Sequence, residues 1–488
     1  MEAIPIAIFW CVASWCLLKG RQALVYLFFA SMPFGSFAVI PTVVTGGLTL
    51  TPTPIVAVLL IARQLGAPAG LRQTLDAALK ASGLLMLAVF WVVAGVTTIF
   101  MPRFFAGTVT IVPVRAGALS DSAPLVPTPQ NLSQFIYVSI SILTVFVFAR
   151  LLRTEAMRRH AVAALCLGAA LTVFTGALDM ASPYLPIGPV LELFRTASYE
   201  LLTEVEVLDV RRVVGLMPEA SSFGTLALAF LAVLYFFRRA MAAGRLRDIV
   251  APVLMVLLLL LVCLSTSSAA YLGLGFFGAA AGVDWCLRLM APPSARALRR
   301  GLAGEFWLAA GALVALLVVL FAAPHILAPV REMFDMMVLQ KSASSSYEER
   351  GTWNQVSLAA LFATDGLGVG LGSTRASNFA VALLSSAGVV GAGCYFLFVL
   401  QCLVLRRPPP GDAQARALLS ALRWSFLPGF FTSLMIGTTP DFGLFNAFFY
   451  GFAVALTQRS ARQWRPQAPP AAAPTLLLVH GPDARVQH

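Results

Sequence analysis

The chain has 488 residues, of which 59% are hydrophobic and only 11% are charged. Soluble domains carry about 25% charged residues, and a soluble fold of this length cannot hide so much apolar surface. The composition therefore predicts an integral membrane protein and excludes disordered, collagen-like, coiled-coil and soluble multidomain chains. The formal net charge of +12 comes mostly from arginines in short clusters between apolar runs, which favours membrane topology signals over nucleic-acid binding.

Thirteen apolar stretches follow one another along the chain, and most approach the roughly 20 residues that cross a bilayer core. They are 4–18, 23–45, 49–62, 82–101, 133–150, 161–179, 219–237, 249–264, 269–287, 304–324, 378–405, 417–437 and 442–457. The predicted fold is an all-α, polytopic transmembrane helical bundle over residues 1–457. The amino terminus has no basic region and no small-residue cleavage site, so we expect the first stretch to be retained as a span.

The basic residues predict how the bundle is oriented. Placing the amino terminus outside puts 24 Lys and Arg residues in the inner loops and tail, and 9 in the outer loops. This is a strong positive-inside bias. The long segments 180–218 and 325–377 are then outer loops, and the Pro- and Ala-rich segment 458–488 is predicted to be a disordered cytoplasmic tail.

Within the outer segment 180–218, apolar and charged side chains alternate with helical spacing. The apolar side holds Leu191, Phe194, Tyr199, Leu202 and Val205, and the charged side holds Glu192, Arg195, Glu200 and Glu204. This pattern predicts a helix that lies on the outer membrane surface.

Several catalytic signatures are absent from the sequence. It has no Walker A run, no His-Glu-x-x-His pair and no nucleophile elbow, and the glycines at 366, 368, 370 and 372 lack the spacing of a dinucleotide-binding turn. The four histidines are scattered, and the seven cysteines lie inside apolar runs, where small buried hydrophobic residues are expected. We therefore expect neither a metal site nor a cofactor.

The remaining candidates for chemistry are polar residues in, or directly after, the two outer segments. They are Arg211, Arg212, Glu219, Arg350, Arg375 and Asn378. Outer arginines commonly reach to lipid headgroups, but Arg350 lies far from any predicted span. Glu219 lies at the mouth of an apolar helix, where an unpaired carboxylate is costly. It is either functional or a helix-terminal carboxylate stabilised by the helix dipole.

Four motifs occur in a fixed order over roughly residues 25–455. They are Pro52-Thr-Pro54; Arg212-Val-Val-Gly215 followed by Pro218-Glu219-Ala-Ser-Ser-Phe-Gly224; the turn Leu264-Ser-Thr-Ser-Ser268; and Arg350, Trp353, the run Gly366-Leu-Gly-Val-Gly-Leu-Gly372, Ser377-Asn378 and Gly388-Val-Val-Gly391. Together they resemble the O-antigen ligase and polysaccharide polymerase superfamily.

This resemblance implies a GT-C-like, metal-independent, inverting glycosyltransferase in the bacterial inner (cytoplasmic) membrane, with its site on the periplasmic face. The donor would be an oligosaccharide on undecaprenyl diphosphate. Arg212 and Arg350 match the arginines expected to stabilise the leaving diphosphate, as planar guanidinium groups do well without an ion. Glu219 is the candidate general base, and Arg211, Arg375 and Asn378 are candidates for substrate binding.

Two departures from the family pattern bear on the reaction. The family's ligases carry a histidine where this chain has Ser377, and many members carry an arginine where it has Ser268. The resemblance therefore favours a polymerase that joins repeat units into an O-antigen or exopolysaccharide chain, with membrane lipid and a chain-length regulator as further partners. The alternatives are a ligase that uses a lipid A core acceptor and a transporter or flippase of lipid-linked sugars, which should show repeats and buried midplane charges.

Overall fold

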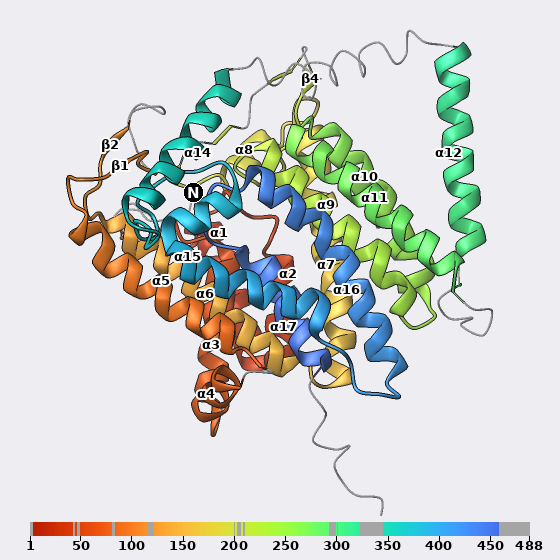
Figure 1. Ribbon diagram of the computed structural model, residues 1–488. Helices are drawn as coiled ribbons and strands as arrows, with labels where there is room; N and C mark the ends of the chain where they lie inside the picture. Colours follow the sequence, from red (N-terminus) through yellow and green to blue (C-terminus); the bar gives the residue numbers. More distant parts are fainter. Residues whose placement is uncertain are drawn as a thin grey trace, which may run out of the picture.

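The computed structural model describes residues 3–41, 44–45, 49–80, 83–114, 122–199, 201–202, 206–207, 210–291, 299, 301–322 and 345–457. These residues form a helical bundle with two short antiparallel strand pairs (Figure 1). The helices are α1 (Ala3–Lys19), α2 (Arg21–Ala30), α3 (Pro52–Leu65), α4 (Gly70–Leu79), α5 (Leu85–Phe104), α6 (Pro129–Leu151), α7 (Glu155–Ala181), α8 (Gly188–Glu192), α9 (Ala220–Phe237), α10 (Ala251–Leu264), α11 (Ser268–Leu289), α12 (Leu302–Ala322), α14 (Ser345–Ala363), α15 (Phe379–Leu400), α16 (Ala413–Ile436) and α17 (Gly443–Thr457). Short helical turns are η1 (Arg238–Ala240), η2 (Leu246–Val250) and η5 (Gln401–Leu405).

The two strand pairs lie in loops at one end of the bundle. Strand β1 (Thr110–Ile111) pairs with β2 (Ala123–Pro124), and β3 (Glu206–Val207) pairs with β4 (Val210–Arg211). This end also carries α8 and α14 and is called the α14 end below; the opposite end is called the α4 end (Figure 1).

The prediction of an all-α membrane protein is confirmed. Within the described part of the chain, seven helical segments are long and apolar enough to cross a membrane: α5, α6, α7, α9 with η1, η2 with α10, α11, and α15 with η5. The helices α3 and α4 add an eighth if they count as one span bent by 101°. A helix lies in each of the thirteen predicted stretches, but thirteen crossings stays a prediction because several of these helices are short.

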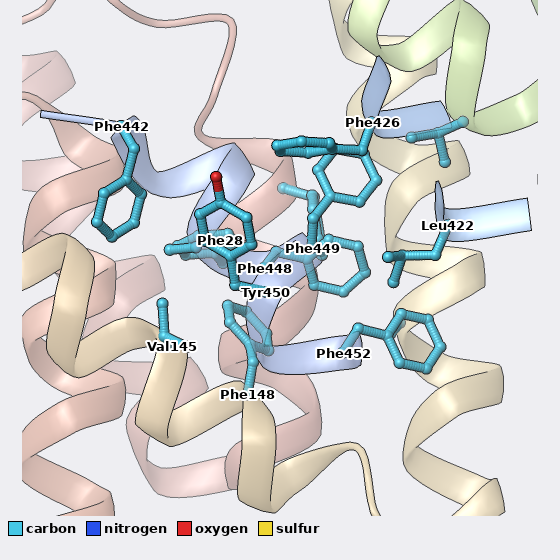
Figure 2. Close-up of a cluster of buried hydrophobic side chains, with 14 of the residues drawn as sticks. Phe28, Val145, Phe148, Leu422, Phe426, Phe442, Phe448, Phe449, Tyr450 and Phe452 are labelled. Atoms are coloured by element: carbon cyan, nitrogen blue, oxygen red, sulfur yellow. The ribbon is translucent and has the colours of Figure 1, made fainter. Parts of the chain in front are cut away.

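The centre of the bundle is built from aromatic side chains. Helix α17 has 15 residues, and all of them from Ala447 to Leu456 are buried. Phe448 packs edge-on against Phe148 of α6, with ring centroids 5.2 Å apart (Figure 2). A Cβ at Gly451 would lie 2.5 Å from the Phe148 Cβ atom, so the two backbones approach closely. A helix that is apolar on every side is stable only when protein or lipid surrounds it, and here protein does.

A buried ion network joins α11 and α12 to the end of α9. Arg288 donates to Asp284 at 2.9 Å and also pairs with Glu305 of α12. Arg239 donates to Asp284 at 2.6 Å, and the Tyr235 hydroxyl lies 3.3 Å from Glu305. Each charge has an opposite partner, which is what the burial of ions requires.

Two predicted helices are corrected by the structure. The stretch 23–45 is helical only as far as Ala30, because Pro33 cannot continue a helix and the following residues form turns. The predicted surface helix over 191–205 is also wrong. Helix α8 ends at Glu192, residues 193–199 are irregular, and residues 200 and 203–205 lie outside the described residues.

Tertiary hydrogen bonds explain the loss of this surface helix. The backbone amides of Thr196 and Ala197 both donate to the carbonyl of Ser36 at 3.0 Å, and the Thr196 hydroxyl accepts from the Ala38 amide at 3.0 Å. The amphipathic pattern is real, but these bonds to the irregular segment after α2 replace helical ones. The predicted tail at 458–488, residues 325–344 of the predicted loop 325–377, and the last two residues of the predicted stretch 304–324 lie outside the described residues.

Candidate functional site

A single buried carboxylate shapes the loop that leads into α9. Asp179, near the end of α7, is 1% exposed. Its Oδ2 atom accepts from the backbone amides of Val214 and Gly215 at 2.8 and 3.0 Å. Its Oδ1 atom pairs with Arg195 at 3.0 Å and with Arg211 at 3.2 Å. Arg195 and the residues from Arg211 to Gly215 are thus held by one carboxylate at the end of α7, a candidate membrane-spanning helix.

Arg212 points away from this carboxylate toward the turn between α10 and α11. Its Nε atom donates to the Thr266 hydroxyl at 3.1 Å and to the Ser265 carbonyl at 3.3 Å. The amide of Val213 donates to the Leu264 carbonyl at 3.3 Å. Two motifs from the sequence, the Arg212 element and the serine turn, are therefore in direct contact.

Glu219 immediately precedes α9, and its side chain makes no capping bond to the backbone. Its Oε1 atom instead accepts from the hydroxyls of Ser221 and Ser222. Within the described part of the chain, its Oε2 atom accepts no hydrogen bond. The helix-terminal placement expected from the sequence is present, and one carboxylate oxygen remains available.

One face of α14 carries the second part of the site. Arg350, Trp353, Asn354 and Ser357 recur at helical spacing. The guanidinium of Arg375 lies over the Trp353 ring, 4.2 Å from its centroid. The other two side chains of this face hold the backbone around Arg375: Asn354 accepts from the Ser377 amide at 2.8 Å, and the Ser357 hydroxyl donates to the Arg375 carbonyl at 2.9 Å.

The glycine run before Arg375 fills a break in α15. Gly366, Gly368, Gly370 and Gly372 all have positive φ, from +76° to +85°. Helix α15 is interrupted at Gly388, and the amides of Val369 and Gly370 donate to the carbonyls of Ser385 and Ser386 that this break frees. A Cβ at Gly368 would lie 2.6 Å from the Gly388 nitrogen. The period-two spacing therefore places glycine wherever the loop turns or touches another backbone.

At the α14 end, the charges of the Arg212–Glu219 part and of the Arg350–Arg375 part affect one another. Burial lowers the pKa of Arg375, the neighbouring Arg350 lowers it further, and the carboxylates of Glu349 and Glu219 oppose this. Burial likewise lowers the pKa of Arg212, and Glu219 opposes it. Glu219 thus interacts with an arginine of each part, and Arg212 and Arg375 stay protonated at neutral pH. No side chain of the described residues forms an ion pair with them.

Four of the six predicted residues therefore form one cluster: Arg212, Glu219, Arg350 and Arg375. The other two are occupied by local contacts. Arg211 pairs with Asp179 and donates to the Ser182 hydroxyl at 3.0 Å. Asn378 precedes α15, and its Oδ1 atom accepts from the amides of Ala380 and Val381 at 2.9 and 3.2 Å.

Asp179, Arg195 and Glu349 interact with this part of the molecule but were not predicted from the sequence as site residues. A signal for Asp179 was present, because it is the only charged residue in the stretch 161–179. An ionisable residue within a span is by itself a reason to expect a function. Glu349 and Arg195 carry no comparable signal. No group of three or more His, Cys, Asp or Glu side chains suited to a metal occurs among the described residues.

Comparison with known proteins adds no family to this picture. The chain matches no protein-family model and no curated protein. The features of the chain that bear on function are therefore the geometry of the cluster and the motifs that form it.

Proposed function

We propose that the chain is a polymerase of the bacterial inner membrane. In this proposal, it joins undecaprenyl-diphosphate-linked oligosaccharide repeat units into an O-antigen or exopolysaccharide chain by metal-independent, inverting, GT-C-like glycosyl transfer at the periplasmic face. One observation carries the proposal: residues from two distant motifs, Arg212 with Glu219 and Arg350 with Arg375, converge on one cluster with an excess of guanidinium groups.

The arginines suit the charge that develops during such a transfer. When the bond between the anomeric carbon and the diphosphate oxygen breaks, the bonding electrons stay on the diphosphate. A guanidinium group donates two parallel hydrogen bonds to phosphate oxygens, so it stabilises this charge without a metal ion. Arg350 and Arg375 lie close enough to repel each other: burial lowers the pKa of Arg375 most, and the nearby Arg350 lowers it further. A diphosphate between them would relieve that repulsion.

Glu219 suits the role of the base. The hydroxyls of Ser221 and Ser222 hold its Oε1 atom, so Oε2 is the atom that would take the proton from the acceptor hydroxyl. The acceptor oxygen then attacks the anomeric carbon on the face opposite the diphosphate, which inverts the configuration. Ser377 supports a polymerase over a ligase, because it stands where ligases carry a histidine and is only 4% exposed.

Arginine-to-lysine substitutions test this proposal. Lysine keeps the positive charge but loses the planar fork. Arg212→Lys and Arg350→Lys should each lower the amount of polymer by one or more orders of magnitude in cells that lack the native gene, because such contacts contribute roughly 2–4 kcal/mol to a transition state. Arg103→Lys is the control, since Arg103 is exposed at the end of α5 and its guanidinium donates to the Ile99 carbonyl of the same helix.

The readout is the length distribution of the polysaccharide together with the level of the folded protein. Loss of long chains, with single repeat units still attached to their acceptor, supports a polymerase. Loss of all transfer to lipid A core would point to the ligase instead. Normal polymer from both lysine variants would refute the diphosphate contact.

A further inference from the structure

Helix α4 lies across the end of the bundle instead of continuing α3. The chain turns by 101° between the two helices. Ala69 has a positive φ of 58° in this elbow, and a Cβ at Gly70 would lie 2.1 Å from the Gln64 carbonyl oxygen. The elbow is therefore fixed by close backbone packing, and α4 lies at the end of the bundle below α3 (Figure 1).

The two sides of α4 differ in chemistry. Leu71, Leu75 and Leu79 recur every four residues and are 59%, 53% and 75% exposed. Ala77, on the opposite side, and Ala78, beside the leucines, pack against the bundle. An exposed leucine stripe on a helix perpendicular to a spanning helix is the pattern of an interfacial helix, whose apolar side sits about 5–10 Å into the boundary between headgroups and acyl chains.

A basic cavity of about 450 Å³ lies beside the polar side of α4. It is enclosed by α4 and by the ends of α6 and α17, and three cations line it: Lys80, Arg150 and Arg153. Among the described residues, Asp76 is the one carboxylate in its wall, and Gln73 and Thr74 add neutral hydrogen-bond donors. This volume lies within the roughly 300–1,000 Å³ of small-molecule sites.

The cations of this cavity crowd one another. Burial lowers the pKa of Arg153, and the nearby Arg150 lowers it further. A bound anion would oppose both effects, because negative charge favours the protonated form of a guanidinium group that burial has removed from water. The leucine stripe places the cavity at the depth of lipid headgroups rather than in bulk water.

We infer that this cavity binds the phosphate headgroup of an anionic phospholipid in the leaflet at the α4 end. Lys80, Arg150 and Arg153 contact the phosphate, and the leucines of α4 lie among the acyl chains of the same leaflet. Basic pockets between membrane helices recognise anionic lipids in this way. The site is at the opposite end of the bundle from the Arg212 cluster, and it does not depend on the proposed reaction.

Lipid binding to the purified full-length chain tests this inference. The chain is delipidated in a neutral detergent, and phosphatidylglycerol, phosphatidylcholine or inorganic phosphate is added. Bound lipid is counted by native mass spectrometry, and the melting temperature is followed in parallel. The wild-type chain should bind phosphatidylglycerol saturably and melt at a higher temperature with it, and it should respond to neither of the other two.

Charge-removing variants locate the site. The double variant Lys80→Gln/Arg153→Gln should bind phosphatidylglycerol about thirtyfold more weakly, and Lys80→Gln alone about fivefold. Arg416→Gln is the matched control, because Arg416 is exposed at the start of α16 and does not line the cavity. Lys80 is itself exposed, so the single variant still tests the site if the double variant does not fold.

Two results would overturn the inference. One is equal affinity of the wild-type chain and Lys80→Gln for phosphatidylglycerol, which leaves only general attraction between a basic surface and anionic lipid. The other is stabilisation by inorganic phosphate equal to that by phosphatidylglycerol, which identifies the occupant as a free anion.

Discussion

Replacing Asp179 by asparagine should destabilise the loop that carries Arg212 more than it destabilises the rest of the bundle. The carboxylate accepts from two backbone amides and pairs with two guanidinium groups. Asparagine keeps the shape but has a single acceptor oxygen. Its amide nitrogen must face either the two backbone donors or the two arginines, and both arrangements bring donors against donors.

The size of the effect follows from burial. The side chain of Arg195 is 6% exposed and that of Asp179 is 1% exposed, so the substitution removes the buried partner of an almost fully buried cation and leaves it the exposed carboxylate of Glu192. Breaking such a pair on one side costs about 3–5 kcal/mol. Arg211 adds less, because it is 32% exposed and water screens its charge. Since asparagine retains one acceptor, we expect the free energy of unfolding to fall by about 3 kcal/mol.

Thermal unfolding of the detergent-solubilised chain measures this change. Asp179→Asn should lower the melting temperature clearly, whereas Asp248→Asn, which breaks an exposed pair with Arg247, should barely change it. Adding Arg211→Gln to Asp179→Asn should restore part of the stability, because one of two opposed guanidinium groups is then gone. If Asp179→Asn melts like the wild-type chain, the carboxylate does not hold the loop and the reasoning from burial fails.

Four further results are expected. Gly368→Ala should lower the free energy of unfolding by more than about 1 kcal/mol, because its φ is +83° and the space is filled, whereas Gly393→Ala in α15 should be neutral or stabilising in the same melt. Trp353→Leu removes the ring under Arg375 and should lower the free energy of unfolding by about 1–2 kcal/mol in the same melt, and Trp353→Phe should lower it by less. Glu219→Gln should lower turnover about 10²-fold or more if the carboxylate is the base, and hardly at all if it only orders Ser221. Finally, if the proposed polymerisation is correct, the purified chain should carry it out in a chelator, and a loss of activity that Mg²⁺ reverses would contradict a metal-independent reaction.

Hydropathy predicted the positions of the helices well because a long apolar run satisfies its own backbone only as a helix. It could not predict which helices pack inside the protein. Helix α17 has the same apolar character as its neighbours, yet it is buried because Gly451 lets it approach Phe148. It also could not show that residues 193–199 are irregular, since this depends on bonds to Ser36, more than 150 positions earlier.

The candidate site was predicted in part for a similar reason. The residue types and their order indicated Arg212, Glu219, Arg350 and Arg375, and the structure brings these four together. Nothing in the spacing of the chain reveals that Arg211 points the other way, toward Asp179. Neighbouring residues in an extended segment face opposite sides, so one of the pair had to turn from the cluster.

The glycine loop in the break of α15 has a consequence for how the protein is made. The amide of Leu371 donates to the Thr98 hydroxyl, and its carbonyl accepts from Asn131, which are 273 and 240 positions away. Contacts so distant in sequence form late, because the intervening chain must first be ordered. A nascent chain therefore carries the Arg212 loop long before Arg375 has a place to dock. Ribosome stalling or truncation before α15 would leave helices inserted in the membrane without a complete candidate cluster, and cellular quality control would have to recognise this unfinished protein.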